Sequence, residues 1–257
     1  MQLSRTPVKI KNVIIICLCM LAFSAKLYAK ANPKVLIFFK EVGEYHHTVT
    51  PTAINAIIKL GEKNAFDVDT TTNAENFTDE NLKQYSAVIF LNTEGDVLEE
   101  EQQEIFKSYI NHGGGFVGIH SATDTEFEWN WYGRLVGAYY KNHPDVQPAT
   151  LKIVDPNQLP TQGLPAVWKR TDEWYNFGWY NDDIKFLVVI DEGSYAGGRN
   201  GGQHPISWYH TFDGGRAFYT AMGHTEESYS EPLFLKHLLG GIEYAMGKKA
   251  NNQSNAR

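Results

Sequence analysis

The sequence predicts an α/β fold, with an open, mostly parallel sheet flanked by helices and an antiparallel extension in the C-terminal half. Between residues 34 and 119, short apolar runs alternate with segments of helical spacing. This alternation is typical of a parallel sheet with crossover helices. Beyond residue 150, short extended runs are separated by proline, asparagine and glycine, which favours antiparallel strands.

The first half is expected to contain four strands and two well-marked helices. The strands are predicted at 34–39, 66–70, 87–91 and 115–119, and the first of them has the apolar run of a strand buried on both faces. One helix is expected to begin at Thr50 as N-cap, with Pro51 in its first turn, and to end at Gly61. The second covers 99–111, where the glycine run 113–115 follows.

The second half is expected to be more antiparallel. Extended runs lie at 150–154, 185–190 and 206–210, and the turn 213–216 predicts a hairpin between 208–212 and 217–221. A last helix is predicted over 231–246. With no repeats and no linker, residues 30–247 are expected to form one domain, followed by a disordered polar tail at 248–257.

Residues 1–29 have the pattern of a cleaved signal peptide. A positive start precedes the apolar run 13–23, which is too short to span a bilayer, and Ala29 is the expected last residue removed. We therefore expect a periplasmic or secreted protein without stable membrane insertion, with lipid anchoring as the alternative. Both cysteines, Cys17 and Cys19, lie in this segment, so the mature chain has neither a disulfide nor a cysteine nucleophile.

Composition limits the classes of partner. The formal net charge is −7 and no basic cluster stands out before Lys248, which argues against nucleic acid. The chain has 6 tryptophans and 14 tyrosines, many in polar, glycine-bearing stretches. This supply suits stacking on the faces of sugar rings, although core packing explains aromatic residues equally simply. A small carbohydrate is the expected partner, and a homo-oligomer is an alternative to a monomer.

The glycine run leads into a strand that ends at His120 and Ser121. In the order small-x-polar-x-small, residues 118–122 resemble a nucleophile elbow, where one side chain projects above the edge of the sheet. The projecting position belongs to His120. His46 and His47 follow the first strand, and carboxyl ends of parallel strands share one edge, so these histidines are expected to converge on a site.

Several motifs together resemble the ThuA-like trehalose-utilisation family, of the class I glutamine-amidotransferase-like superfamily, with its flavodoxin-like sheet. They are Gly118-Ile119-His120-Ser121-Ala122, Trp131-Tyr132-Gly133, Leu135-Val136-Gly137 and Gly215-Arg216-Ala217-Phe218-Tyr219-Thr220-Ala221-Met222-Gly223-His224. The resemblance covers about residues 34–246 and implies a role in the use of trehalose or related glycosides.

The resemblance also implies a triad position. Glutaminases of this superfamily carry a cysteine on the elbow and a late His-x-Glu, which His224 and Glu226 match here. A histidine at position 120 cannot form an acyl-enzyme as a thiolate does, so glutaminase activity is excluded. Ser121 is one residue away from the projecting position and remains the alternative nucleophile.

Two chemistries are open for the histidines. His120 and His224 can act as general base and acid, since imidazole titrates near neutral pH. Alternatively, two or three of the histidines, with Glu173 or Glu226, bind a divalent metal such as zinc. No histidine pair has a compact ligand spacing, so neither a metal nor another cofactor is certain.

Further candidates for substrate binding are polar or aromatic residues near the expected edge. Asp124 and Glu173 are carboxylates suited to sugar hydroxyls, although Asp124 could instead be the N-cap of a following helix. Trp208 and His210 share one face of a predicted strand, which is either core or pocket.

The sequence thus predicts an exported protein that acts on trehalose-like or 3-keto glycosides by histidine acid/base chemistry, with or without a metal. A hydrolase, lyase or isomerase step fits, because a keto group acidifies the adjacent C–H. The alternative is a non-catalytic sugar-binding protein on a degenerate amidotransferase-like fold.

Overall fold

The computed structural model describes residues 31–43 and 46–249. The predicted signal peptide lies outside these residues, as does the polar tail from residue 250 onward. Within the described ranges, no helix combines the length and apolar character that crossing a bilayer requires.

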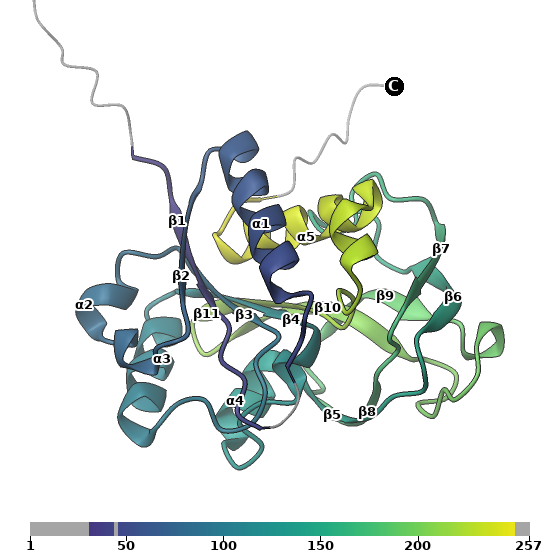
Figure 1. Ribbon diagram of the computed structural model, residues 1–257, viewed down its shortest axis with the longest axis horizontal. Coiled ribbons are helices and arrows are strands. Elements are labelled where there is room, and N and C mark those ends of the chain that lie inside the picture. The colour runs from purple at the N-terminus through teal and green to yellow at the C-terminus, as the bar shows by residue number, and fades with distance from the viewer. Residues whose placement is uncertain (1–30, 44–45, 250–257) are drawn as a thin grey trace, which may run out of the picture. The chain divides into compact units, whose positions relative to one another are not determined.

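A mixed sheet of nine strands forms the centre of the fold (Figure 1). Its order is β2-β1-β3-β4-β11-β10-β9-β6-β7. The parallel part comprises β2 (Asp67–Thr71), β1 (Lys34–Phe38), β3 (Ala87–Leu91), β4 (Gly115–Ile119) and β11 (Gly215–Thr220). The antiparallel part comprises β10 (Pro205–Phe212), β9 (Lys185–Ile190), β6 (Gln147–Ile153) and β7 (Val167–Asp172). The predicted fold class is confirmed.

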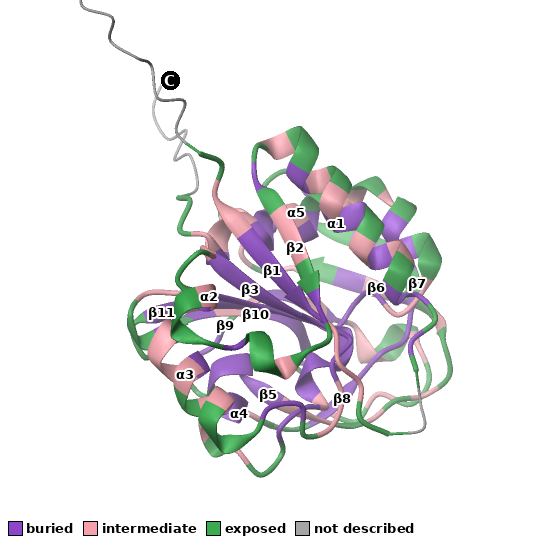
Figure 2. Cartoon of the chain, turned by 60° about the vertical axis from the view of Figure 1, so that its left-hand side comes forward, coloured by how far each residue is buried: buried purple, intermediate pink, exposed green. Residues whose placement is uncertain are grey.

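Helices cover both faces of the parallel strands. On one face lie α1 (Thr50–Asn64) and α5 (Pro232–Ala245); on the other lie α3 (Glu100–Asn111) and α4 (Asn130–Val136), with α2 (Asp79–Leu82) beside α3 (Figure 1). Figure 2 shows the inner strands buried between these layers. Every residue of β3 and β4 is buried, as expected for apolar strands covered on both faces.

Some elements differ from the expectation. Helix α1 continues through Gly61 to Asn64 and ends where Ala65 adopts a left-handed conformation, with φ 55°. Thr50 is its first residue, and Val49 precedes it without a side-chain cap.

A separate two-stranded ribbon, β5 (Ala138–Asn142) with β8 (Asn176–Tyr180), was not anticipated, nor were β7 and α4. Short 3₁₀ turns complete the chain: η1 (Ala74–Asn76), η2 (His120–Thr123), η3 (Glu192–Ser194) and η4 (Glu226–Ser230).

His237 on α5 is a buried core histidine that binds two other segments. Its Nδ1 lies 2.8 Å from the carbonyl oxygen of Pro160, and its Nε2 lies 3.0 Å from Oγ of Ser207 on β10. Burial lowers the pKa of His237 from 6.5 to about 4, so the ring is neutral at neutral pH. The carbonyl fixes the proton on Nδ1, because it can only accept.

This histidine makes stability depend on pH. Because its folded pKa lies below the unfolded value, its contribution is complete above about pH 6.5 and is lost as pH falls toward 4. We expect the free-energy difference of unfolding between the native protein and His237→Gln to shrink by about 2–3 kcal/mol from pH 7 to pH 4.5. Urea unfolding at both pH values measures it. His112→Gln, at an exposed site, is the control, and an equal shrinkage there contradicts the assignment.

Candidate functional site

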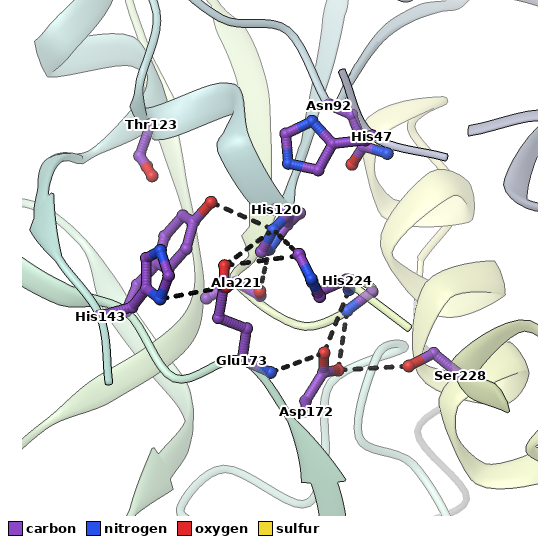
Figure 3. A network of polar contacts seen from close by, with 12 residues as sticks. His47, Asn92, His120, Thr123, His143, Asp172, Glu173, Ala221, His224 and Ser228 are labelled. Carbon is purple, nitrogen blue, oxygen red and sulfur yellow. Dashed lines mark hydrogen bonds and ion pairs between the residues drawn. The ribbon is translucent and has the colours of Figure 1, made fainter. Parts of the chain in front are cut away.

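Three histidines come together at the carboxyl edge of the parallel strands. His47 lies in the turn after β1, His120 directly follows β4, and His224 lies in the turn after β11. Their nearest ring nitrogens all lie within 4.8 Å of one another. Figure 3 shows His120, His224 and Glu173 pointing toward one another, with His47 on the other side of His120. The expected convergence is therefore present, and crossover topology explains it.

The backbone at His120 has the geometry of an elbow. Its φ is 54°, a left-handed conformation that non-glycine residues rarely adopt. The turn also needs small neighbours: a Cβ on Gly118 would lie 2.9 Å from the Tyr219 ring and 3.2 Å from Cβ of Ala122. His120 is completely buried, so its side chain projects into the polar cluster rather than into solvent.

The two ring nitrogens of His120 face different partners. Nδ1 lies 2.9 Å from the carbonyl oxygen of Ala221, which can only accept, so Nδ1 carries the proton. Nε2 lies 3.0 Å from His224 Nδ1, 3.1 Å from the Tyr175 hydroxyl and 3.4 Å from Oε2 of Glu173. Burial raises the pKa of Tyr175 well above its usual value, so the phenol keeps its hydrogen.

His47 is held by a carboxylate. Its Nδ1 and its backbone N–H both contact Oε1 of Glu41, the latter at 2.9 Å. Burial, with smaller effects from the charges of His120 and His224, lowers the pKa of His47 to about 2. The ring is therefore neutral near pH 7, and its contact with Glu41 is a hydrogen bond to a carboxylate rather than an ion pair. With Nδ1 protonated, Nε2 keeps its lone pair.

Asp172, the last residue of β7, fixes the backbone on which two site residues lie. Oδ1 accepts from the N–H groups of Glu173 and His224, at 3.0 and 3.1 Å. Oδ2 accepts from Gly223 N–H at 2.9 Å and pairs with the buried Arg170 guanidinium at 3.0 Å. Because the Asp172 carboxylate is fully buried and has these partners, it fixes the backbone positions of Glu173 and His224 (Figure 3).

A cavity of about 190 Å³ opens beside the histidines. Its walls include Ser121, Asp124, Tyr140, His143 and Glu173. Oγ of Ser121 is buried and has no hydrogen-bond partner among the described residues, so it is available to a ligand in the cavity. The cavity is smaller than the roughly 300–1,000 Å³ of pockets for drug-sized ligands, and it suits one small polar molecule.

Two of the carboxyl groups that line the cavity, those of Asp124 and Glu173, have pKa values shifted in opposite directions. Burial raises the pKa of Asp124, against smaller opposing effects of His120 and His143. Burial alone would raise the pKa of Glu173 as well. The hydrogen bond and charge of His120 outweigh this effect, together with the charges of His224 and His143, so the pKa of Glu173 is lowered. Such divergence is typical of sites that use one carboxylic acid and one carboxylate.

His143 follows β5 and stands at the cavity wall with its side chain 37% exposed. Its Nδ1 lies 3.0 Å from Oε1 of Glu173 and 3.0 Å from the carbonyl oxygen of Pro144. Both partners accept only, so they place the proton on Nδ1 and leave the Nε2 lone pair for another group.

The structure does not bring every predicted residue to this site. Trp208 and His210 are core residues of β10, with ring nitrogens 2.7 Å and 2.8 Å from the carbonyl oxygens of Val136 and Leu135. Glu226 is exposed at the start of η4, and Glu173 instead is the carboxylate beside His224, at 3.4 Å.

Two further expectations change in detail. Asp124 caps no following helix, because α4 begins only at Asn130, so the hydroxyl-binding interpretation is the one that remains. The side chain of His46 is 67% exposed and lies 3.4 Å from Oε2 of Glu41, outside the histidine cluster.

Sequence reasoning missed Glu41, Tyr140 and His143. His143 and Tyr140 belong to the unexpected ribbon strand β5 and its exit, and nothing in the local pattern places that ribbon at the carboxyl edge. The signal that could have pointed to them is the density of aromatic and histidine residues between 139 and 143.

Comparisons with known proteins agree with this architecture. The family model described as "ThuA: Trehalose utilisation" matches residues 34–245. A solved ThuA-like protein from Bacteroides uniformis ATCC 8492 is 24% identical with a TM-score of 0.73, covering 86% of this chain and 95% of its own. A second ThuA-like protein, from Parabacteroides merdae ATCC 43184, is 20% identical with a TM-score of 0.70. The match covers 86% of this chain and 92% of the Parabacteroides chain.

A β-galactosidase from Bacillus circulans sp. alkalophilus shares the fold over 87% of this chain but only 32% of its own length, at 13% identity and a TM-score of 0.55. At these identities the structural likenesses show the fold alone. No curated protein sequence matches the chain.

Proposed function

Because this chain belongs to the ThuA trehalose-utilisation family, we propose that it is an exported protein that processes small carbohydrates by proton transfer in the cavity beside His143. The substrates we propose are trehalose-like glycosides or their 3-keto forms. One observation carries the proposal: His143, Asp124 and the Ser121 hydroxyl, which has no partner within the described part of the chain, all face one small polar cavity at the carboxyl edge of the sheet.

The size and lining of the cavity support a sugar ring. The wall offers hydroxyl, carboxyl and imidazole groups, which match the alternating donors and acceptors of sugar hydroxyls. Tyr140 and Tyr175 add aromatic surface; their ring centroids lie 4.5 Å apart. Export to the periplasm or beyond is supported by the pattern of residues 1–29.

The positions of the proton-transfer groups suggest an elimination. In a 3-keto glycoside the carbonyl acidifies the hydrogen at C2, and Nε2 of His143 takes that proton. The C2–H electron pair forms the C1=C2 double bond while the glycosidic C1–O bond breaks, and the leaving oxygen takes the proton of Asp124. The products are an alcohol and an unsaturated keto sugar. Return of one proton from His143 to Asp124 through water restores both groups.

In this scheme Glu173 orients the base, and His120 and His224 lie behind it. His120 is completely buried and reaches the cavity only through Glu173 or Tyr175, so it is not placed to exchange a proton with a sugar directly. The acid/base roles predicted for His120 and His224 are therefore proposed here for His143 and Asp124 instead.

The test is turnover of a panel by the purified protein: trehalose, other glucosides and the 3-keto form of each, followed by the released alcohol and by enone absorbance. We expect turnover of at least one keto form. Saturable binding without turnover would move the assignment to a non-catalytic sugar-binding protein. Neither binding nor turnover would remove the carbohydrate proposal altogether.

A further inference from the structure

The histidine rings of the site surround one point. The ring centroids of His47 and His120 lie 5.1 Å apart, those of His120 and His224 5.0 Å, and those of His47 and His224 5.9 Å. Imidazoles whose nitrogens sit about 2 Å from one tetrahedral ion have centroids roughly 5 Å apart. The three come from the ends of three different strands, so local sequence does not force them together.

A carboxylate lies beside two of these histidines at a similar spacing. His120 Nε2 and His224 Nδ1 are 3.0 Å apart, and each lies 3.4 Å from Oε2 of Glu173. The edge of a tetrahedron around zinc is roughly 3.3 Å for metal–nitrogen bonds of about 2 Å. These three atoms therefore have the mutual distances of ligands on one ion.

Two of the three histidines have an outer partner for the ring proton. The Nδ1 proton of His120 is taken by the Ala221 carbonyl, and that of His47 by the Glu41 carboxylate. Metal-binding histidines in proteins are oriented by such outer partners. Oε1 of Glu173 is likewise held by His143 at 3.0 Å.

We propose that His47, His120 and His224, with Glu173 as fourth ligand, form a binding site for one divalent transition-metal ion of the zinc class. Three imidazole nitrogens and one carboxylate oxygen favour such ions over calcium and magnesium, which prefer oxygen ligands. His47 and Glu173 also line the cavity, so the ion lies beside its wall. Its part in turnover rests on the proposed function, whereas its binding does not.

The test measures metal binding without turnover. The protein is freed of metal with a chelator and titrated with ZnCl₂ by calorimetry, and metal content after gel filtration is measured by mass spectrometry. We expect one zinc per chain. His120→Gln and His224→Gln should each weaken binding at least 100-fold, and the outer-partner variant Glu41→Gln about 10–100-fold.

His46→Gln is the matched control, because His46 adjoins a ligand but contacts only the outer partner Glu41, and its affinity should stay within about threefold. A Co²⁺ titration adds a spectroscopic readout, since a four-coordinate site gives intense visible bands. No stoichiometric binding, or zinc binding unchanged in His120→Gln, overturns the site. Turnover that persists in chelator-treated protein overturns only the role of the ion and leaves the proposed function standing. Tight zinc binding without turnover on the panel supports the metal site and contradicts the proposed function.

Discussion

Replacing His143 with glutamine is expected to lower kcat on the best substrate of the panel by about 10²–10⁴-fold, the usual contribution of a general base. Glutamine keeps an amide that can donate to Glu173, which lies 3.0 Å from His143 Nδ1, but it cannot take a proton. KM should therefore change by less than about threefold. Steady-state kinetics on the purified variant separates the two constants.

The split between kcat and KM distinguishes this role from a structural one. Loss of the base should lower kcat and leave KM nearly unchanged, whereas a merely displaced substrate would raise KM. His112→Gln is the control: its ring is exposed at the end of α3, where its Nδ1 contacts the Ser108 carbonyl. A kcat for His143→Gln within tenfold of the native value would contradict the assignment.

Replacing Asp172 with asparagine is expected to destabilise the protein by about 3–5 kcal/mol, the cost of breaking a buried charge pair. The carboxylate accepts from three backbone N–H groups and pairs with Arg170, and both side chains are almost fully buried. An asparagine NH₂ would place a donor against donors, and the Arg170 guanidinium would keep Glu231, at 3.3 Å, as its charged partner. Urea unfolding monitored by tryptophan fluorescence measures the loss.

The matched control is Glu226→Gln, an acidic-to-amide change at an exposed position near the same turn, which should alter stability by less than about 0.5 kcal/mol. The folded fraction of Asp172→Asn should also lose zinc affinity, because Asp172 holds the backbone of His224 and Glu173. A destabilisation below about 1 kcal/mol would show that this network matters little to the fold.

The inner strands of the parallel half could be predicted from the sequence because β3 and β4 are apolar throughout. The strand predicted at 87–91 is the one observed as β3, and that at 115–119 is β4. Strand β7 could not be predicted in this way, because it has charged residues at buried positions. Its buried positions are Trp168, Arg170 and Asp172, so two charges occupy the inner face and reverse the usual pattern.

The site could be predicted only where it depends on strand ends. The topology rule brought His47 and His120 to one edge, the family resemblance pointed to His224, and the structure gathers these three there. Trp208 and His210 resembled pocket residues because alternation along a strand does not tell a ligand-facing side from a core-facing one. His143 depends on long-range pairing of the ribbon β5–β8, which has no local signature, whereas Glu173 was already among the predicted candidates.

The elbow histidine and its partner after β11 are separated by 104 residues along the chain. Closing a loop of that length costs roughly 4 kcal/mol of chain entropy, beyond a constant term. The unfolded polypeptide therefore holds no preformed chelate, and the cluster assembles only after β4 and β11 have paired. Contacts this distant slow folding, so during refolding the site should appear with the slowest phase. An ion bound there would therefore stabilise the native state relative to the unfolded and partly folded states, in which the cluster is not assembled.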